Sequence, residues 1–172
     1  MKSLILSILS IMTTQCSFFM DDDSLSIPLT PYTGDQLRID GYYYEIGHDG
    51  ETIHSAFFLY KNGMLIHCGG SKSSLEEMDR YIKTYFVDNK RRYVKYELGV
   101  FLIEGNNIKF ERWYPSQVPY RAYVKEGVVL NNTTFHITKS YRSNGTGEEE
   151  QNEMYYFRPF SPKPDSTNNY IK

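Results

Sequence analysis

Short runs rich in Tyr, Phe, Val and Ile alternate with Gly, Asn and Asp at intervals of about ten residues between positions 37 and 160, a spacing typical of antiparallel strands joined by tight turns. The runs 56–60 and 100–103 are apolar or aromatic at every position, so both faces of those strands must be covered. Aromatic residues make up 16% of the chain, enough to form a packed core. We therefore predict a mainly β fold, an antiparallel meander of about 8 or 9 strands closed into a barrel.

The dipeptide Asn62-Gly63 separates two of these runs and predicts a hairpin. Asn-Gly is the preferred pair for a two-residue type I′ turn, because both central positions need a positive φ. With such a turn, Phe58 faces His67, and His54 lies four residues further along the same face, about 13 Å away at about 3.3 Å per residue. Two ligands of one metal ion lie much closer together than that, so no metal site is expected.

One segment, 73–86, has a helical pattern. Apolar residues from Leu75 to Ile82 recur on one face, and Ser73 and Glu76 have the spacing of a capping box. We predict a single α-helix over 73–86, which covers one side or one end of the barrel.

The first fifteen residues have the layout of a secretory signal. Lys2 precedes a nine-residue apolar run, Leu4 to Met12, which is much shorter than the ~20 residues that a membrane-spanning helix needs. This segment ends directly before Cys16, and in that respect it resembles the signals of bacterial lipoproteins. The resemblance implies that residues 1–15 are removed and that Cys16 is lipidated. A plain secretory signal and a buried hydrophobic start of the domain are the alternatives.

Several acyl chains on Cys16, at about 0.8 kcal/mol per buried methylene, would hold the protein on a membrane. The resemblance thus implies an exported protein, anchored by lipid in the bacterial cell envelope, with the outer membrane as its destination. Residues 16–36 contain the acidic run Asp21 to Asp23 together with Pro28 and Pro31, which favours an extended, solvated tether. The barrel domain then covers 37–160. Residues 161–172 form a C-terminal tail.

The barrel predicted over 37–160 resembles the lipocalin-like group. The likeness rests on the strand layout, and the stretch Asp40-Gly41-Tyr42-Tyr43 is loosely similar to the Gly-x-Trp motif of the first lipocalin strand. Small bacterial members of this group are often lipid-anchored. The resemblance implies a barrel that holds a small apolar ligand or no ligand.

Several functional classes find no support in the sequence. The net charge of −2 gives no bulk attraction for nucleic acid, and a basic-aromatic stretch that begins at Lys90 is interpreted as a solvated loop. No nucleophile elbow, zinc-protease motif, phosphate loop or dinucleotide fingerprint is present in the sequence. Cys68 is interpreted as a small buried apolar residue. The strand carboxylates Glu97, Glu104 and Glu111 are expected on solvated faces, and no cofactor is expected.

The large stock of tyrosines is the feature that most suggests binding, since Tyr combines an apolar ring with a polar tip. The candidate ligand-binding residues are Tyr43, Phe58, Tyr60, His67, Tyr96, Trp113, Tyr123 and Tyr156. Our leading hypothesis is a non-enzymatic envelope lipoprotein that binds a small apolar ligand, a glycan or a protein partner. The alternatives are an envelope hydrolase or isomerase that uses strand Glu and His residues, and a purely structural or assembly-associated lipoprotein.

Overall fold

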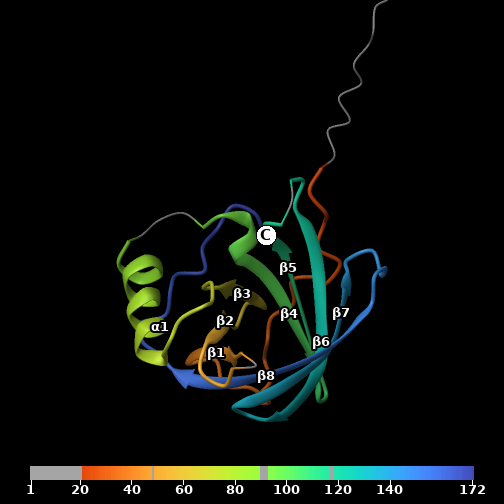
Figure 1. Ribbon diagram of the computed structural model, residues 1–172. Coiled ribbons are helices and arrows are strands. Elements are labelled where there is room, and N and C mark those ends of the chain that lie inside the picture. Colours follow the sequence, from red (N-terminus) through yellow and green to blue (C-terminus); the bar gives the residue numbers. More distant parts are fainter. Residues whose placement is uncertain (1–20, 48, 90–92, 117) are drawn as a thin grey trace, which may run out of the picture.

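The computed structural model describes residues 21–47, 49–89, 93–116 and 118–172. In this part of the chain the strands form a closed antiparallel barrel, in which each strand pairs with its sequence neighbours and β8 pairs with β1 (Figure 1). The strands are β1 (Gly41–Ile46), β2 (Ile53–Leu59), β3 (Met64–His67), β4 (Leu98–Glu104), β5 (Asn107–Tyr114), β6 (Arg121–Asn131), β7 (Thr134–Arg142) and β8 (Glu149–Pro159). This arrangement confirms the predicted lipocalin-like barrel.

The interior of the barrel, its lumen, is filled at one end by aromatic and aliphatic side chains. Phe57 on β2 lies 4.9 Å, ring to ring, from Phe110 on β5, a strand on the other side of the barrel. Phe135 on β7 stacks on Tyr155 of β8 at 4.8 Å. We call this packed end the floor; its other members include Tyr43, Leu59, Leu65, Phe101, Ile108 and Ile137. Because side chains alternate along a strand, these residues fix which face of every strand points inward.

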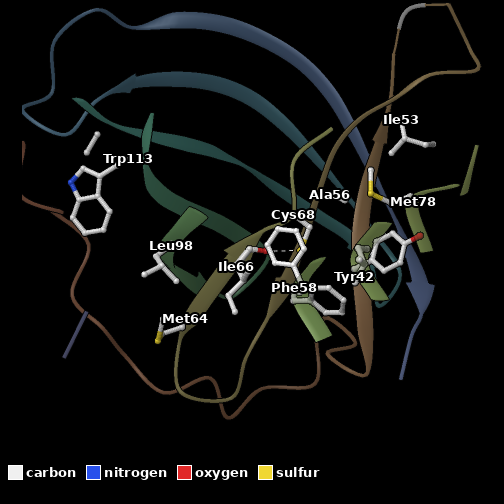
Figure 2. Close-up of a cluster of buried hydrophobic side chains, with 13 residues drawn as sticks. Tyr42, Ile53, Ala56, Phe58, Met64, Ile66, Cys68, Met78, Leu98 and Trp113 are labelled. Carbon is white, nitrogen blue, oxygen red and sulfur yellow. Dashed lines mark hydrogen bonds between the residues drawn. The ribbon is translucent and has the colours of Figure 1, made fainter. Parts of the chain in front are cut away.

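Helix α1 (Leu75–Ile82) covers the outer face of β1–β3. It continues as a π-helix over Lys83–Asp88 and begins two residues later than predicted. Its cap is correspondingly shifted, because the Oγ of Ser74 accepts the N–H of Glu77 at 3.2 Å. The apolar face of α1 packs on the outward side chains of the strands, where Met78 joins Tyr42, Phe58, Ile66 and Cys68 in one buried cluster (Figure 2).

The hairpin between β2 and β3 differs from its prediction by one residue. Phe57, and not Phe58, pairs with His67, because the turn contains three residues, Lys61 to Gly63. Gly63 has a φ of 85°, as in a type I turn closed by a glycine bulge, so only one position takes the left-handed conformation. A β-carbon at Gly63 would also lie 2.1 Å from the carbonyl oxygen of Thr30. The shift pairs His67 with Phe57, whose ring points into the lumen.

Residues 21–36 do not form the solvated tether that their composition suggested. This segment, which we call the strap, lies across the outer faces of β4–β6, where Ile27 packs against Val100 and Val124. Its backbone is held by Glu111 of β5, whose carboxylate accepts the N–H of Ser26 at 2.7 Å and that of Ile27 at 2.7 Å. Glu111 has no exposed surface, so its expected place on a solvated face is wrong. The tether prediction fails because Glu111 supplies the acceptor that these backbone groups need.

The C-terminal tail returns along the barrel and is also packed. The ammonium group of Lys163 donates to the carbonyl oxygens of Ile39 and Leu59 at 2.6 and 2.7 Å, and the hydroxyl of Tyr60 donates to the carbonyl of Pro164 at 2.7 Å. Burial lowers the pKa of Lys163 to about 8. The strap and the tail together cover much of the outer wall that the helix leaves open.

Candidate functional site

The lumen is polar at the end opposite the floor. Continuing along the inward faces of the strands, the apolar side chains are replaced by polar ones, all of them partly exposed. We call this group the mouth cluster; it consists of Glu45, Ser55, His67, Arg112, Tyr114, Tyr123, Lys125, Ser140, Gln151 and Glu153. Seven of the eight strands contribute to it, so the cluster exists only because the barrel closes.

An ion pair stands at the boundary between the mouth cluster and the floor. The ammonium group of Lys125 on β6 lies 2.6 and 2.5 Å from the two carboxylate oxygens of Glu153 on β8, and the two side chains are only 17% and 15% exposed. The hydroxyl of Tyr155, whose ring belongs to the floor, donates to Glu153 at 3.1 Å and lies 3.4 Å from Glu45. Burial, and then the charges of Glu153 and Glu45, raise the pKa of Tyr155 well above its usual value, so this hydroxyl remains a donor.

Two titratable groups of the mouth cluster have shifted pKa values. Burial, with the neighbouring charge of Glu153, raises the pKa of Glu45. Burial, with the positive charges of Arg112 and Lys125, lowers the pKa of His67 well below 6.5. The His67 ring is therefore neutral near pH 7. Its Nδ1 faces the N–H of Gly69 at 3.4 Å, so the proton belongs on Nε2.

Aromatic rings and a cation form the outer part of the mouth cluster. The guanidinium of Arg112 lies over the ring of Tyr114 at 3.8 Å and donates to the carbonyls of Tyr96 and Trp113 at 3.3 and 3.2 Å. Within the described part of the chain Arg112 forms no ion pair with a carboxylate. The rings of Tyr114 and Tyr123 meet edge to face at 5.4 Å.

These two rings line a small recess. Its volume is about 220 Å³, and its wall is made by Tyr114, Ser116, Tyr123, Lys125 and Ser140. The recess therefore offers aromatic surfaces, hydroxyl groups and one ammonium group to a molecule that enters from solvent.

A larger recess of about 530 Å³ lies outside the barrel, between the strap and the tail. Its acidic groups are already bound within the chain: Asp22 pairs with Lys95 at 2.8 Å, and Asp23 pairs with Arg121 at 2.9 Å. The mouth cluster is the better candidate site, because within the described part of the chain Arg112 forms no ion pair with a carboxylate, and its side chain, like that of His67, is partly exposed.

The structure brings together only some of the candidate residues chosen from the sequence. His67 and Tyr123 line the mouth, and Tyr43 lies in the floor. The others point outward: Phe58 lies beneath α1, Tyr60 contacts the tail, Trp113 lies beneath the strap, Tyr96 packs on Tyr120, and Tyr156 is exposed beside Tyr44. They share an aromatic character with the mouth residues but not the inward-facing position.

Sequence reasoning missed the charged members of the mouth cluster. Lys125 and Glu153 occupy alternate positions of their strands, and charged residues at such positions are also typical of a strand face exposed to solvent. The sequence of a single strand therefore does not indicate that these two side chains face the lumen. The one usable signal is that Tyr123 and Lys125 share a strand face, as do Arg112 and Tyr114. Cys16, His48 and the stretch Lys90 to Arg92 lie outside the described residues.

The described residues contain no group of three or more His, Cys, Asp and Glu side chains placed to hold a metal ion. Among the helices described, none is both long and apolar enough to cross a membrane. Cys68 is buried in the cluster beneath α1. Comparisons of the chain with protein families, with curated proteins and with solved structures find no match.

Proposed function

We propose that this chain is a non-enzymatic, lipid-anchored protein of the bacterial cell envelope, whose barrel binds a small polar ligand at its mouth. A sugar ring is the ligand chemistry that fits best. The observation that carries this proposal is the recess at the mouth, where Tyr114 and Tyr123 offer ring surfaces beside Lys125 and Ser140. Sugars are bound by such combinations, since their C–H faces pack on aromatic rings and their hydroxyls need polar partners.

The filled floor argues against a long apolar ligand. Rings of Phe57, Phe110, Phe135 and Tyr155 lie 4.8 to 6.4 Å apart across the lumen, which is ordinary packing distance for aromatic side chains. A recess of about 220 Å³ is also below the roughly 300–1,000 Å³ of most small-molecule sites. A ligand the size of one sugar ring, part of it projecting into solvent, agrees with both facts.

Titrations monitored by amide NMR shifts would test the binding. The probes are glucose, N-acetylglucosamine and decanoate. We expect a saturable response to a sugar at the amides of Tyr123 and Ser140, and none to decanoate. A response to decanoate alone would show that the floor opens, and would favour a carrier of apolar molecules instead. No response to any probe would contradict a ligand site at the mouth.

A matched pair of variants tests the role of the rings. Two aromatic contacts at about 0.5–1.5 kcal/mol each correspond to roughly a 5- to 150-fold effect, so the double replacement of Tyr114 and Tyr123 by Ala should weaken sugar binding at least 5-fold. Tyr156→Ala, which removes an exposed ring on the outer face of β8, should leave binding unchanged.

The anchor is supported by the sequence before Cys16. Intact mass and detergent partitioning of the protein expressed in a bacterial envelope, compared with a Cys16→Ala variant, test it directly. We expect cleavage before Cys16 and added acyl mass, both lost in the variant. A soluble, unmodified product would contradict the anchor.

Two titratable groups favour an enzyme as the second candidate. Glu45 has a raised pKa and His67 a strongly lowered one, and both belong to the mouth cluster. Opposite shifts of this kind are common where a carboxylic acid and a neutral imidazole exchange protons with a substrate. A hydrolase or isomerase would lose turnover in His67→Ala while its thermal unfolding stayed cooperative. An assembly-associated lipoprotein, the third candidate, would be recognised by a stable complex with envelope proteins.

A further inference from the structure

The strap begins at the mouth of the barrel and not at the floor. The backbone N–H of Asp23 donates to the carbonyl of Tyr120 at 2.9 Å, and the N–H of Tyr120 donates to the carboxylate of Asp22 at 2.7 Å. Tyr120 directly precedes β6, in the connection from β5 that forms part of the mouth rim. The chain therefore enters the described fold at the mouth end.

Three cations fix this entry point. Asp22 pairs with Lys95 at 2.8 Å, and the carboxylate of Asp23 lies 2.9 Å from Arg121 and 3.2 Å from Arg142. The cations come from three different parts of the chain, and every side chain in these ion pairs is less than a third exposed. The start of the strap is thus held at the rim by ion pairs as well as by backbone hydrogen bonds.

The length of chain before this point limits where a lipid on Cys16 can lie. Six residue steps separate Cys16 from Asp22, which allows at most about 22 Å when fully extended. The far end of β6, at Leu130, lies about 30 Å along the strand from Arg121, or about 23 Å along the axis of a barrel with ordinary strand tilt. A lipid attached at Cys16 can therefore hold the mouth end against a bilayer while the floor end points away from it.

The mouth rim also presents apolar side chains to solvent. Val118, in the connection between β5 and β6, is 86% exposed, the largest exposure among the large hydrophobic residues described. Ile46, at the mouth end of β1, is 38% exposed. An apolar side chain at the tip of a loop loses unfavourable contact with water when it enters the interfacial region of a membrane.

We propose that the rim around the barrel mouth is a membrane-contact surface, with the bilayer as its partner and Val118 at the point of contact. This inference rests on the proposed lipidation of Cys16. It adds that the anchor and the rim act at the same end of the barrel, so the mouth cluster opens beside the lipid surface.

The test compares two apolar positions at opposite ends of β6. Val118→Cys and Leu130→Cys, each in the lipidated full chain, are labelled with bimane and placed in vesicles of phosphatidylethanolamine and phosphatidylglycerol that contain a nitroxide lipid as quencher. Leu130 is a matched control because it is 55% exposed and apolar but lies at the floor end. A chain without an introduced Cys measures the labelling of Cys68, which is buried.

We expect at least threefold stronger quenching at position 118 than at position 130. Insertion of twenty Gly and Ser residues between Met20 and Asp21 should abolish most of the difference, because the short connection no longer holds the rim to the bilayer. Equal quenching at both positions, or a difference that the insertion leaves unchanged, would overturn the inference. Intact mass of the same samples separates the two claims: acylated chains with equal quenching overturn the orientation alone, whereas chains without acyl mass overturn the anchor on which it rests.

Discussion

Replacing Glu111 by alanine should release the strap from the barrel. This carboxylate is fully buried on the outer face of β5, and it accepts the backbone N–H groups of Ser26 and Ile27 as well as the hydroxyl of Ser26 at 3.1 Å. Without it, two backbone donors have no acceptor at a site from which the strap excludes water. They must then either stay unpaired or regain water by detachment of the strap.

The magnitude follows from those contacts. A hydrogen bond to a charged group contributes about 1.5–3 kcal/mol, so two of them give about 3–6 kcal/mol as the loss if the strap stays in place. Detachment of the strap sets an upper limit to this loss of stability, because the freed N–H groups regain water. The cost is then the exposure of Ile27 and its apolar neighbours, at about 1.5–3 kcal/mol per side chain. We expect Glu111→Ala to lower the free energy of unfolding by about 3–5 kcal/mol. Glu111→Gln should cost less, because the amide oxygen still accepts one N–H.

Urea unfolding and the fluorescence of Trp113 measure the two parts of this prediction. Trp113 is the single tryptophan of the chain, is 4% exposed, and donates its indole N–H to the carbonyl of Asp23 at 2.6 Å. Its emission should move to longer wavelength in Glu111→Ala before global unfolding. Glu104→Ala, an exposed carboxylate on β4, is the control and should stay within about 0.5 kcal/mol. A loss below 1 kcal/mol with unchanged emission would refute the reasoning.

Acid should also detach the strap. Hydrogen bonding from Lys95 lowers the pKa of Asp22. Burial opposes the same shift in Asp23, but the hydrogen bonds that its carboxylate accepts from Arg121, Ala122 and Arg142 outweigh burial and lower its pKa. Both carboxylates therefore contribute stability that is complete above about pH 4 and is lost as the pH falls further, and the acid transition in Trp fluorescence should shrink in Asp23→Asn. Gly127→Ala should destabilise the barrel by more than about 2 kcal/mol in urea unfolding, because a β-carbon there would lie 1.9 Å from the carbonyl oxygen of His136. A smaller loss of stability would show that β6 and β7 can separate locally. Tyr155→Phe should cost about 1–2 kcal/mol in the same assay, because the Glu153 carboxylate loses a donor in a buried place, and an unchanged midpoint would contradict that role.

The barrel could be predicted because its determinants are local. Alternating apolar residues and glycine or asparagine turns mark each strand, and runs such as 100–103, apolar on both faces, require cover on the outside as well as the inside. The helix could be predicted for the same reason, although it begins two residues later than expected. The structure has Ser74 as the N-cap in place of Ser73, because either serine can accept a backbone N–H.

The mouth cluster and the strap could not be predicted, because both depend on contacts between distant residues. Glu111 and Glu104 look alike in sequence, yet one is buried beneath the strap and the other is exposed. The hairpin at Gly63 shows the same limit, since its third turn residue places His67 opposite Phe57, on the inward face, and not opposite Phe58. Local patterns predict the wall of the barrel but not what covers each face of it.

The two ends of the described chain meet at the mouth side of the barrel. Asp22 and Asp23 of the strap line the same recess as Tyr170, Ile171 and Lys172 of the tail. The connectivity is therefore nearly circular: a short linker from the tail to the strap would close the chain, and new termini could be opened in the turn at Gly105. Such a circular permutant would keep every strand pairing and carry its attachment point at the floor, so the same barrel would stand on its opposite end.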